Sequence, residues 1–471
     1  ASGVSADGSI VVGYSFNNAG DHEAFRWVSD GTPTGGTMTG LGFLADTGHY
    51  LSSASGVSAD GSVVVGYSDT NIMVPAAFLW TEGTGMVSLA SVLQNAGVDL
   101  TGWTLSTATG VSGDGNIIVG VDEYQSVGFI ANVTAGGLIT PEALNQSLGA
   151  MGQVGPAVSG MGQLSMSRLG GVAGGQGAHV RVAGGPGGHE QGLAGGDETP
   201  GRLDLWAVGS LGSNVELNGD DLGLHGGLGL SWDNGGEWRF GGGLFADSRD
   251  LDTDYHGNQD IQAVGPGVFV AYRPEDTGLE FRVSSLWQSV DLDLKRGYLN
   301  GAGYAASSGS TNAEVFGISG RAQWTKPVTG SLDLTPFAEY TWQTCHIDGY
   351  SESDGPFPAS YDSRTEESNS IRTGLRADLA LFEDLGLWTW GAWNHRFEDS
   401  SSGLGGTATG LGAFSYSGAT LDQDWADLGV GLTRRFSDRL TTTFSLGGAL
   451  GCDDDSVPDL TATVGFSYQL W

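Results

Sequence analysis

Residues 459–470 read DLTATVGFSYQL, and this stretch decides the fold of the second half of the chain. Apolar and polar residues alternate along it without interruption, which is the two-residue period of a β-strand. The apolar set lies on one face and the small polar set on the other. The apolar positions are Leu460, Ala462, Val464, Phe466, Tyr468 and Leu470. The pattern therefore predicts a strand with one apolar and one polar face.

The same alternation recurs in residues 313–324 (AEVFGISGRAQW) and 370–381 (SIRTGLRADLAL). A soluble β-sandwich would show the same alternation, so the lengths of the connections between strands have to distinguish a sandwich from a membrane barrel. Short turns such as DNGGE at 233–237 alternate with long polar loops such as those expected at 247–260 and 295–312. Short turns on one rim and long loops on the other are typical of an outer-membrane barrel.

Counting strands between these connections predicts an all-β fold, a twelve-stranded antiparallel transmembrane barrel over residues 203–471. No segment reaches the roughly 18 consecutive apolar residues of a transmembrane helix. Tryptophans near predicted strand ends suit the aromatic girdles that mark the two membrane surfaces. These are Trp238, Trp287, Trp342, Trp388 and Trp393.

Residues 138–202 lose the strand pattern and are expected to form helices and a linker. Thr140 is a good N-cap and Pro141 suits the first helical position, and a second helix is expected to begin at Pro156. Repeated glycines weaken both helices, so we expect them to thread the barrel lumen, with Gly-rich residues 170–201 leading back to the first strand. The apolar helix residues expected to touch the lumen wall are Leu144, Leu148, Met151, Met161, Leu164 and Met166. Their expected partners are the glycines that the strand period places inside the barrel, namely Gly317, Gly374, Gly429, Gly431, Gly447 and Gly465.

Several charged residues also fall on the predicted lumen face of the strands. They are Glu280, Arg282, Arg321, Glu339, Arg372, Arg376 and Asp427. Buried charges persist only when they are paired, so we expect an ion network within the wall. A compatible interpretation is that the same network also grips the helix.

The first 137 residues contain one phrase three times. ASGVSADGSIVVGYS at 1–15 returns as ASGVSADGSVVVGYS at 54–68 and as ATGVSGDGNIIVGVD at 108–122. Asp-Gly marks a tight turn, and the β-branched run after it predicts the returning strand. Four short antiparallel strands in about fifty residues suit a propeller blade. Three units are too few to close a ring, so either further units lie upstream of residue 1, which we favour, or the three units stack as an open end-piece.

Composition excludes several functions. The chain has 54 acidic and 19 basic residues, a net charge of -35, which argues against a nucleic-acid partner. Cys345 and Cys452 are too few and too far apart for a disulfide framework. The sequence shows no G-x-S-x-G elbow and no histidine spacing typical of a metal site, so we expect neither a catalytic site nor a cofactor. Acidic residues at 247–260 and 452–459 could bind calcium, although solvated loops have the same composition.

The repeats resemble the HAF-family extracellular repeat. His22, Ala24, Phe25 and Trp27 match its H-A-F-x-W region with Glu23 inserted. The second unit keeps only Ala77, Phe78 and Trp80, without the histidine.

The order of parts, which is repeats, helical linker and barrel, resembles a monomeric autotransporter of Gram-negative bacteria. SRLGG at 167–171 and LDLWAVGSLG at 203–212 resemble the linker end and the first strand. The C-terminal residues resemble the signal read by the outer-membrane assembly machinery; they are Phe466, Tyr468, Leu470 and Trp471. The family usually places tyrosine two residues before the last aromatic residue, whereas Tyr468 precedes Trp471 by three.

The resemblance implies a barrel anchored in outer-membrane lipid, a passenger (1–137) outside the cell, and help from periplasmic chaperones and the barrel assembly machinery. We expect the passenger to be a binding or adhesive module for an unknown extracellular ligand, and not an enzyme. A porin-like channel with a surface domain is the first alternative. An enzymatic passenger whose catalytic part lies upstream of residue 1 is the second.

Overall fold

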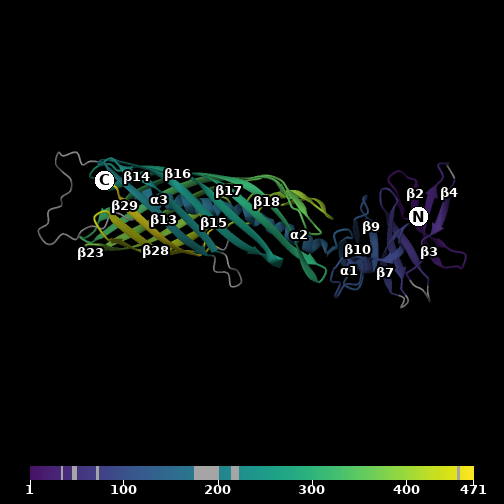
Figure 1. The fold of residues 1–471 in the computed structure, drawn as a ribbon. Coiled ribbons are helices and arrows are strands. Elements are labelled where there is room, and N and C mark those ends of the chain that lie inside the picture. The colour runs from purple at the N-terminus through teal and green to yellow at the C-terminus, as the bar shows by residue number, and fades with distance from the viewer. Residues whose placement is uncertain (33–34, 45–49, 71–73, 174–200, 214–221, 453–456) are drawn as a thin grey trace.

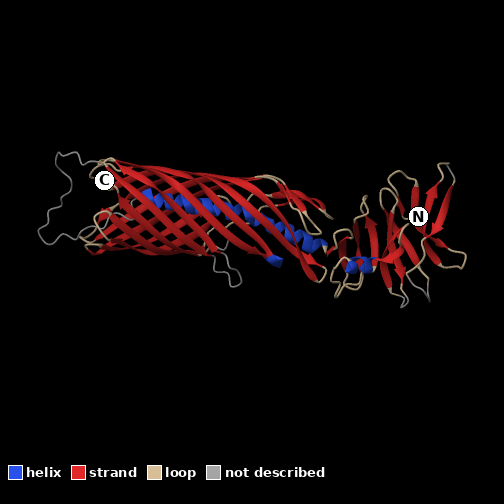
Figure 2. Ribbon diagram, viewed as in Figure 1, coloured by secondary structure: helices blue, strands red, loops and turns tan. Residues whose placement is uncertain are grey.

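The computed structural model describes residues 1–471 apart from 33–34, 45–49, 71–73, 174–200, 214–221 and 453–456. The described chain forms a long barrel with a helix inside it, and three small sheets follow one another beyond one end of the barrel (Figure 1, Figure 2). The C-terminus lies at the other end of the barrel. No helix among the described residues combines the length and the apolar character that crossing a membrane requires.

Twelve antiparallel strands form the barrel, which confirms the predicted fold class. β13 pairs with β29 and so closes the sheet between its first and last strands. The twelve strands are β13 (Arg202–Ser213), β14 (Leu222–Asp233), β15 (Trp238–Thr253), β16 (Gly257–Tyr272), β17 (Leu279–Asn300), β18 (Gly303–Trp324), β20 (Leu332–Ile347), β23 (Arg364–Phe382), β24 (Leu385–Arg396), β27 (Asp424–Arg435), β28 (Leu440–Leu450) and β29 (Leu460–Gln469). The two-residue strand β19 (Lys326–Pro327) lies beside β20, and the short helix η2 (Asp254–His256) joins β15 to β16.

Two of the predicted long loops are mainly strand. Residues 247–260 belong mostly to β15 and β16, and residues 295–312 form the hairpin between β17 and β18. β17 and β18 have 22 residues each, whereas about 9–11 residues suffice to cross a membrane. The prediction is wrong here because a strand beyond the membrane carries polar residues on its outer face and so has the composition of a loop.

The polarity of the wall reverses along these long strands. The first outward positions of β17 are apolar and exposed: Leu279, Phe281, Val283 and Trp287. The outward positions that follow are polar: Ser289, Asp291 and Asp293. The buried inward positions change in the opposite sense. Apart from Leu286 the first ones are polar (Glu280, Arg282, Ser284 and Gln288), and those that follow are apolar (Val290, Leu292 and Leu294). An apolar outer face suits lipid and a polar one suits water, so β17 leaves the membrane between Trp287 and Ser289.

The helical segment occupies the barrel interior (Figure 2). It consists of α2 (Pro141–Ala150), the 3-10 turn η1 (Met151–Gln153) and α3 (Val154–Ala173). The Thr140 hydroxyl accepts a hydrogen bond from the Ala143 amide at 3.1 Å, which is the expected N-cap. Helix α3 starts slightly before Pro156 and runs past Gly170, so the first residues of the expected linker are helical. Residues 174–200 of that linker lie outside the described residues.

Residues before the helix form three four-stranded antiparallel sheets, each with its strands in sequence order. The first sheet contains β1 (Gly3–Val4), β2 (Ile10–Phe16), β3 (His22–Ser29) and β4 (Gly36–Gly40), and the second contains β5 (Ser52–Val57), β6 (Val63–Asp69), β7 (Pro75–Thr81) and β8 (Gly85–Ser88). The third contains β9 (Thr107–Val111), β10 (Ile117–Asp122), β11 (Val127–Asn132) and β12 (Gly137–Ile139). Helix α1 (Leu89–Asn95) lies between the second and third sheets in sequence. A fourth small sheet packs beside the helix at the end of the barrel that is nearer to these three sheets. It contains β21 (Tyr350–Ser351), β22 (Ala359–Tyr361), β25 (Leu404–Ala408) and β26 (Gly412–Tyr416).

Each repeat begins with the same hydrogen-bonded turn. In the second repeat Asp60 accepts hydrogen bonds from the Ser58 hydroxyl at 2.6 Å and the Ser62 amide at 3.0 Å. Gly61 takes a φ of +74°, a conformation that side chains other than glycine rarely adopt. Asp7 and Asp114 make the equivalent bonds. The repeated sequence phrase therefore encodes a turn stabilised by an ionised aspartate.

The turn makes the stability of the sheets depend on pH. The hydrogen bonds from Ser58 and Ser62 lower the pKa of Asp60 from 3.8 to about 2. A lowered pKa means that the carboxylate stabilises the fold fully above about pH 4 and loses this effect as the pH falls toward 2. Asp60→Ala should therefore lower the Tm of the sheets at neutral pH, and its difference from the unchanged chain should shrink between about pH 4 and pH 2.

Circular dichroism melts of the full chain would follow this difference, with the exposed Glu82→Ala as a matched control. A Tm difference that stays constant down to pH 2 would show that the Asp60 carboxylate does not stabilise the turn.

Candidate functional site: the barrel lumen

The helix lies against one side of the lumen, where α3 contacts β15 to β18 and β20. Four of the expected contact residues are buried in one apolar cluster with wall residues such as Leu292 and Val315; they are Leu144, Leu148, Met151 and Met161. Met166 is buried in a second cluster with Phe245, Phe269 and Leu286. Leu164 is half-buried and lines a cavity on the opposite side of the helix.

The expected partners of these residues were mostly wrong. Only Gly317 has a helix side chain over it, with the Met166 Cγ 3.5 Å from the position of a Cβ. Gly429 and Gly447 lie under the Trp390 ring, and Gly431 lies under Trp388. The remaining two also face wall side chains; Gly374 meets Phe337 and Gly465 meets Thr443.

Trp388 is only 7% exposed and faces the lumen, so it does not belong to the membrane girdle. The wall glycines therefore mainly make room for bulky wall side chains, and the helix packs against larger apolar residues. The two-residue period alone could not reveal this, because it gives the direction of a side chain and not its neighbour across the lumen.

Glycines of the helix allow its close approach to the wall. A Cβ on Gly162 would lie 2.7 Å from the Val315 side chain and 2.9 Å from the amide oxygen of Gln343. A Cβ on Gly155 would collide with the carboxylate of Glu366. The same glycines that weaken an isolated helix are thus required where the helix touches strands β18, β20 and β23.

A buried carboxylate, Asp247 on β15, fastens the helix to the wall. The Ser165 hydroxyl of α3 lies 2.9 and 2.7 Å from its two oxygens. Nδ1 of His225 on β14 lies 2.9 Å away, and the Gln288 side-chain amide of β17 also donates to it. Nη1 of Arg168, on the next turn of α3, lies 3.8 Å from the same carboxylate. Because all these groups are buried, Asp247 is the polar centre of the helix seat.

Sequence reasoning missed Asp247 because residues 247–260 were expected to form a loop. The alternation of Phe245, Asp247, Arg249 and Leu251 on the inward face was the signal that could have revealed it.

The predicted lumen network forms as separate ion pairs within the wall. Arg321 lies 3.3 Å from Glu339, and Arg372 lies 3.1 Å from Asp427. Two partners were not foreseen. Glu280 pairs with Arg282 and also, at 2.8 Å, with Arg273, and Arg376 pairs with Asp378 at 2.6 Å. Among the described residues no ion pair joins these predicted charges to the helix, so their contacts stabilise the wall.

A second buried ion pair holds α2 at the mouth of the barrel. Arg296 of β17 binds both carboxylate oxygens of Glu352, at 2.9 and 2.7 Å. It also donates to the Ser147 hydroxyl of α2 at 2.8 Å and to the Phe357 carbonyl at 2.6 Å. Glu352 accepts further bonds from the Ala359 amide and the hydroxyl of Tyr361. Every oxygen of this buried pair is therefore hydrogen-bonded, which a buried ion pair requires.

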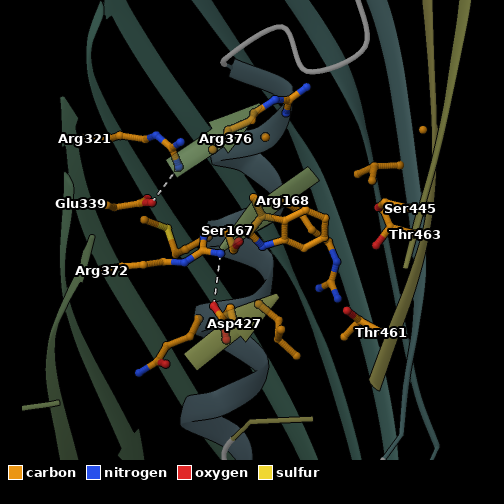
Figure 3. A pocket seen from close by; sticks show the side chains of 18 of the residues that line it. Ser167, Arg168, Arg321, Glu339, Arg372, Arg376, Asp427, Ser445, Thr461 and Thr463 are labelled. Carbon is orange, nitrogen blue, oxygen red and sulfur yellow. Dashed lines mark hydrogen bonds and ion pairs between the residues drawn. The ribbon is translucent and has the colours of Figure 1, made fainter. Parts of the chain in front are cut away.

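Metal binding has no support among the residues that the structure describes, because no three or more His, Cys, Asp or Glu side chains gather in a way that could hold an ion. Residues 453–456 of the second acidic stretch lie outside them. The lumen instead contains one well-formed cavity beside α3, lined by arginine and tryptophan side chains (Figure 3).

Removing the Asp247 carboxylate should loosen the plug. Asp247→Ala leaves His225 and Arg168 buried without their acceptor, and breaking a buried pair in this way costs about 3–5 kcal/mol. We expect the single-channel conductance in planar bilayers to rise several-fold while the barrel stays folded. Asp291→Ala, which changes an exposed outward carboxylate on β17, should leave the conductance unchanged. Equal conductance of the two variants would show that Asp247 does not hold the helix.

Comparison with known proteins agrees with this architecture. The autotransporter beta-domain family matches residues 205–447. The translocator domain of autotransporter NalP from Neisseria meningitidis superposes with a TM-score of 0.50 at 13% identity, covering 67% of this chain and 98% of that chain. The beta domain of the Bordetella autotransporter BrkA gives a TM-score of 0.39 at 14% identity, covering 57% and 99%.

An uncharacterized protein of the trpE-trpG intergenic region of Pseudomonas putida is 26% identical over 189 residues, or 39% of this chain. The chain spans only 31% of the length of that relative. The likeness to NalP shows the fold alone. The family match covers more than half of the 471 residues, so this chain belongs to the autotransporter beta-domain family.

Proposed function

We propose that the barrel displays residues 1–137 on the surface of a Gram-negative bacterium, as a passenger that stays attached and binds an extracellular ligand. The family supports the outer-membrane anchor. That residues 1–137 lie outside the cell and bind a ligand is our inference. It is supported by the contacts between these residues and the mouth of the barrel.

The last sheet of residues 1–137 shares a core with the barrel mouth. Ile130 and Ile139 belong to the same apolar cluster as Phe357, Leu404 and Phe414 of the barrel. The backbone is joined as well. The Leu138 amide donates to the Asn300 side chain at 2.7 Å, and the Leu138 carbonyl accepts from Gly301 at 2.7 Å. The Asn132 side chain donates to the Pro356 carbonyl at 2.8 Å.

This docking supports a passenger that is held at the surface in a fixed orientation.

The topology supports export through the pore. An even number of antiparallel strands puts both ends of the barrel on one rim, where Arg202 begins β13 and Gln469 ends β29. The sheets lie beyond the opposite rim (Figure 1). The chain therefore has to cross the lumen between them, and α3 is that crossing. Helix α3 also fills part of the lumen, which disfavours the porin-like alternative.

The composition of the sheets supports a binding module. An exposed aromatic group lies at the ends of β2 and β3, where Tyr14 is 52% and Phe16 is 69% exposed. The His22 ring lies between them, 5.4 Å from Tyr14 and 4.3 Å from Phe16, measured between ring centroids. Exposed aromatic clusters are typical of interaction sites. We also propose that the repeats are related to the HAF-family repeat and that each one resembles a propeller blade.

The partners in assembly follow from the same proposal. Phe466 and Tyr468 are 51% and 41% exposed on the outer face of β29, where lipid or the assembly machinery can reach them. The Leu470 amide donates to the Leu203 carbonyl at 2.8 Å, so pairing with β13 continues past the end of β29. We propose that these terminal residues are recognised by the barrel assembly machinery after periplasmic chaperones deliver the chain.

Cysteine labelling on intact cells tests the topology. Ser310→Cys lies on the exposed part of β18 beyond the membrane and should react with a bulky, membrane-impermeant maleimide. Ala143→Cys and Ser165→Cys are buried in the mouth and lumen and should stay unlabelled until the protein is denatured. Cys345 and Cys452 would be replaced by serine in all three variants. Labelling at Ser310 only after permeabilisation would reverse the proposed orientation, and rapid labelling at Ser165 would favour an open channel.

A further inference from the structure

The seat of α3 leaves a cavity of about 350 Å3 on the other side of the helix (Figure 3). Leu164 and Ser167 line it from the helix, and β23, β24 and β27 to β29 line it from the wall, together with residues of β13, β15, β18 and β20. We propose that this cavity binds a small organic anion, with a carboxylate, sulfonate or phosphate group and a compact apolar body. The proposal concerns the lumen alone and does not depend on what the passenger binds.

Positive charge dominates the lining of the cavity. Five arginines line it, against the two carboxylates Glu339 and Asp427. Each of these carboxylates already has an arginine partner, Arg321 and Arg372 respectively. Arg168, Arg239 and Arg376 pair with carboxylates outside the lining, namely Asp247, Asp204 and Asp378. The groups that line the cavity thus carry more positive than negative charge, which favours an anion over a cation.

The hydrogen-bonding groups of the lining show the same preference. Four buried nitrogen atoms on it donate to no protein acceptor; they are Nε1 of Trp206, Nε of Arg372, Nη1 of Arg376 and Nδ2 of Asn394. Trp206 and Asn394 are more than nine-tenths buried. Among the described residues, no side-chain oxygen atom of the lining is buried without a partner in the same way.

Because the buried side-chain groups without a partner are all donors, the cavity suits an anion better than it suits water. A buried water molecule donates as well as accepts, and so it fits a cavity that offers both kinds of partner. An anion only accepts, and a wall of N–H donors satisfies it completely. Ser445 and Thr463 on the facing strands add hydroxyl groups that can also donate, whereas the Thr461 hydroxyl already donates to the Gly447 carbonyl at 3.3 Å (Figure 3).

The arginines are held in place by aromatic rings. The Arg376 guanidinium lies 4.3 Å from the centre of the Trp388 ring, and that of Arg321 lies 3.9 Å from the centre of Phe337. Asp378 binds two nitrogen atoms of Arg376 and leaves Nη1 free of protein partners. A fixed guanidinium loses little conformational freedom on binding, which favours affinity.

Size and apolar surface define the body of the ligand. A cavity of about 350 Å3 is at the small end of ligand sites, and it exceeds what an inorganic anion needs. Leu164, Trp390 and Trp425 supply apolar surface next to the arginines. A ring or a short chain bearing one anionic group is the class of ligand that uses both features.

Binding would also brace the helix on its open side. Ser167 belongs to α3, whereas Arg372 and Arg376 belong to β23 across the cavity. An anion that accepts from both sides adds a contact to those that α3 already makes with β23, such as the hydrogen bond from Gln163 to Ser368. By linkage, a ligand that binds only the assembled lumen raises the Tm of the barrel.

Benzoate and benzenesulfonate are suitable probes, with benzamide as the uncharged control. The full chain in detergent would be titrated at constant ionic strength by equilibrium dialysis, with protein-free micelles as the blank. We expect one saturable site for both anions, none for benzamide, and a higher Tm in the presence of either anion. The charge-balanced variant Arg376→Gln with Asp378→Asn should weaken binding at least tenfold.

The matched control is Arg434→Gln with Asp384→Asn, an exposed pair outside the cavity that should bind like the unchanged chain. Heat-modifiable migration on gels shows that each variant is folded, and Arg372→Gln with Asp427→Asn provides a second test if the first variant does not fold. Binding of benzamide equal to that of benzoate, or equal affinities of the cavity and control variants, would overturn the site. Sulfate that competes as well as benzenesulfonate would overturn the apolar part of the proposal.

Discussion

Every backbone N–H and C=O group that faces lipid must find its partner inside the protein, because lipid offers none. The pairing of β13 with β29 meets this requirement at the last two edges of the sheet, from Asp204 opposite Gln469 to Ser213 opposite Leu460. Closure with twelve antiparallel strands puts both ends of the sheet on one rim. A segment that continues to sheets beyond the other rim therefore has to pass through the barrel. The position of α3 follows from hydrogen bonding at the wall and not from the properties of the helix itself.

The lumen then stabilises a helix that could not persist alone. Beyond the membrane the inner face of the wall is apolar, and there Leu148, Met151 and Met161 are buried against it. Within the membrane the inner face is mixed: Ser165 and Arg168 meet the Asp247 carboxylate, and Met166 packs against Phe245 and Leu286. Each part of the helix therefore meets matching surroundings. The cavity lies on the side of α3 that faces away from its apolar seat, where β24 and β27 to β29 complete the wall.

The sequence predicts the barrel well because lipid imposes a strict alternation on strands such as residues 459–470. The same rule placed Arg321, Glu339, Arg372 and Asp427 in the lumen, where the structure has them. The prediction failed where water replaces lipid. The outer positions of β17 become polar at Ser289, and the strand then resembles a loop.

The sequence also could not predict which side chains contact one another across the lumen. The period gave the direction of Gly429, whereas Trp388 was expected in the membrane girdle and faces the lumen instead. The period also could not show that a tryptophan ring covers the wall glycines, or that Asp247 would meet Ser165 from a segment 82 residues away in sequence.

Hydrogen exchange of the α3 amides tests the central claim, that the barrel wall stabilises this glycine-rich helix inside the lumen. The full chain would be placed in lipid nanodiscs and its exchange followed by mass spectrometry, with a peptide of residues 141–173 as the reference. The account predicts that the amides of Val154–Ala173 are protected for as long as those of β17, whereas the free peptide exchanges within seconds. Exchange of α3 in the full chain as fast as in the peptide would contradict it.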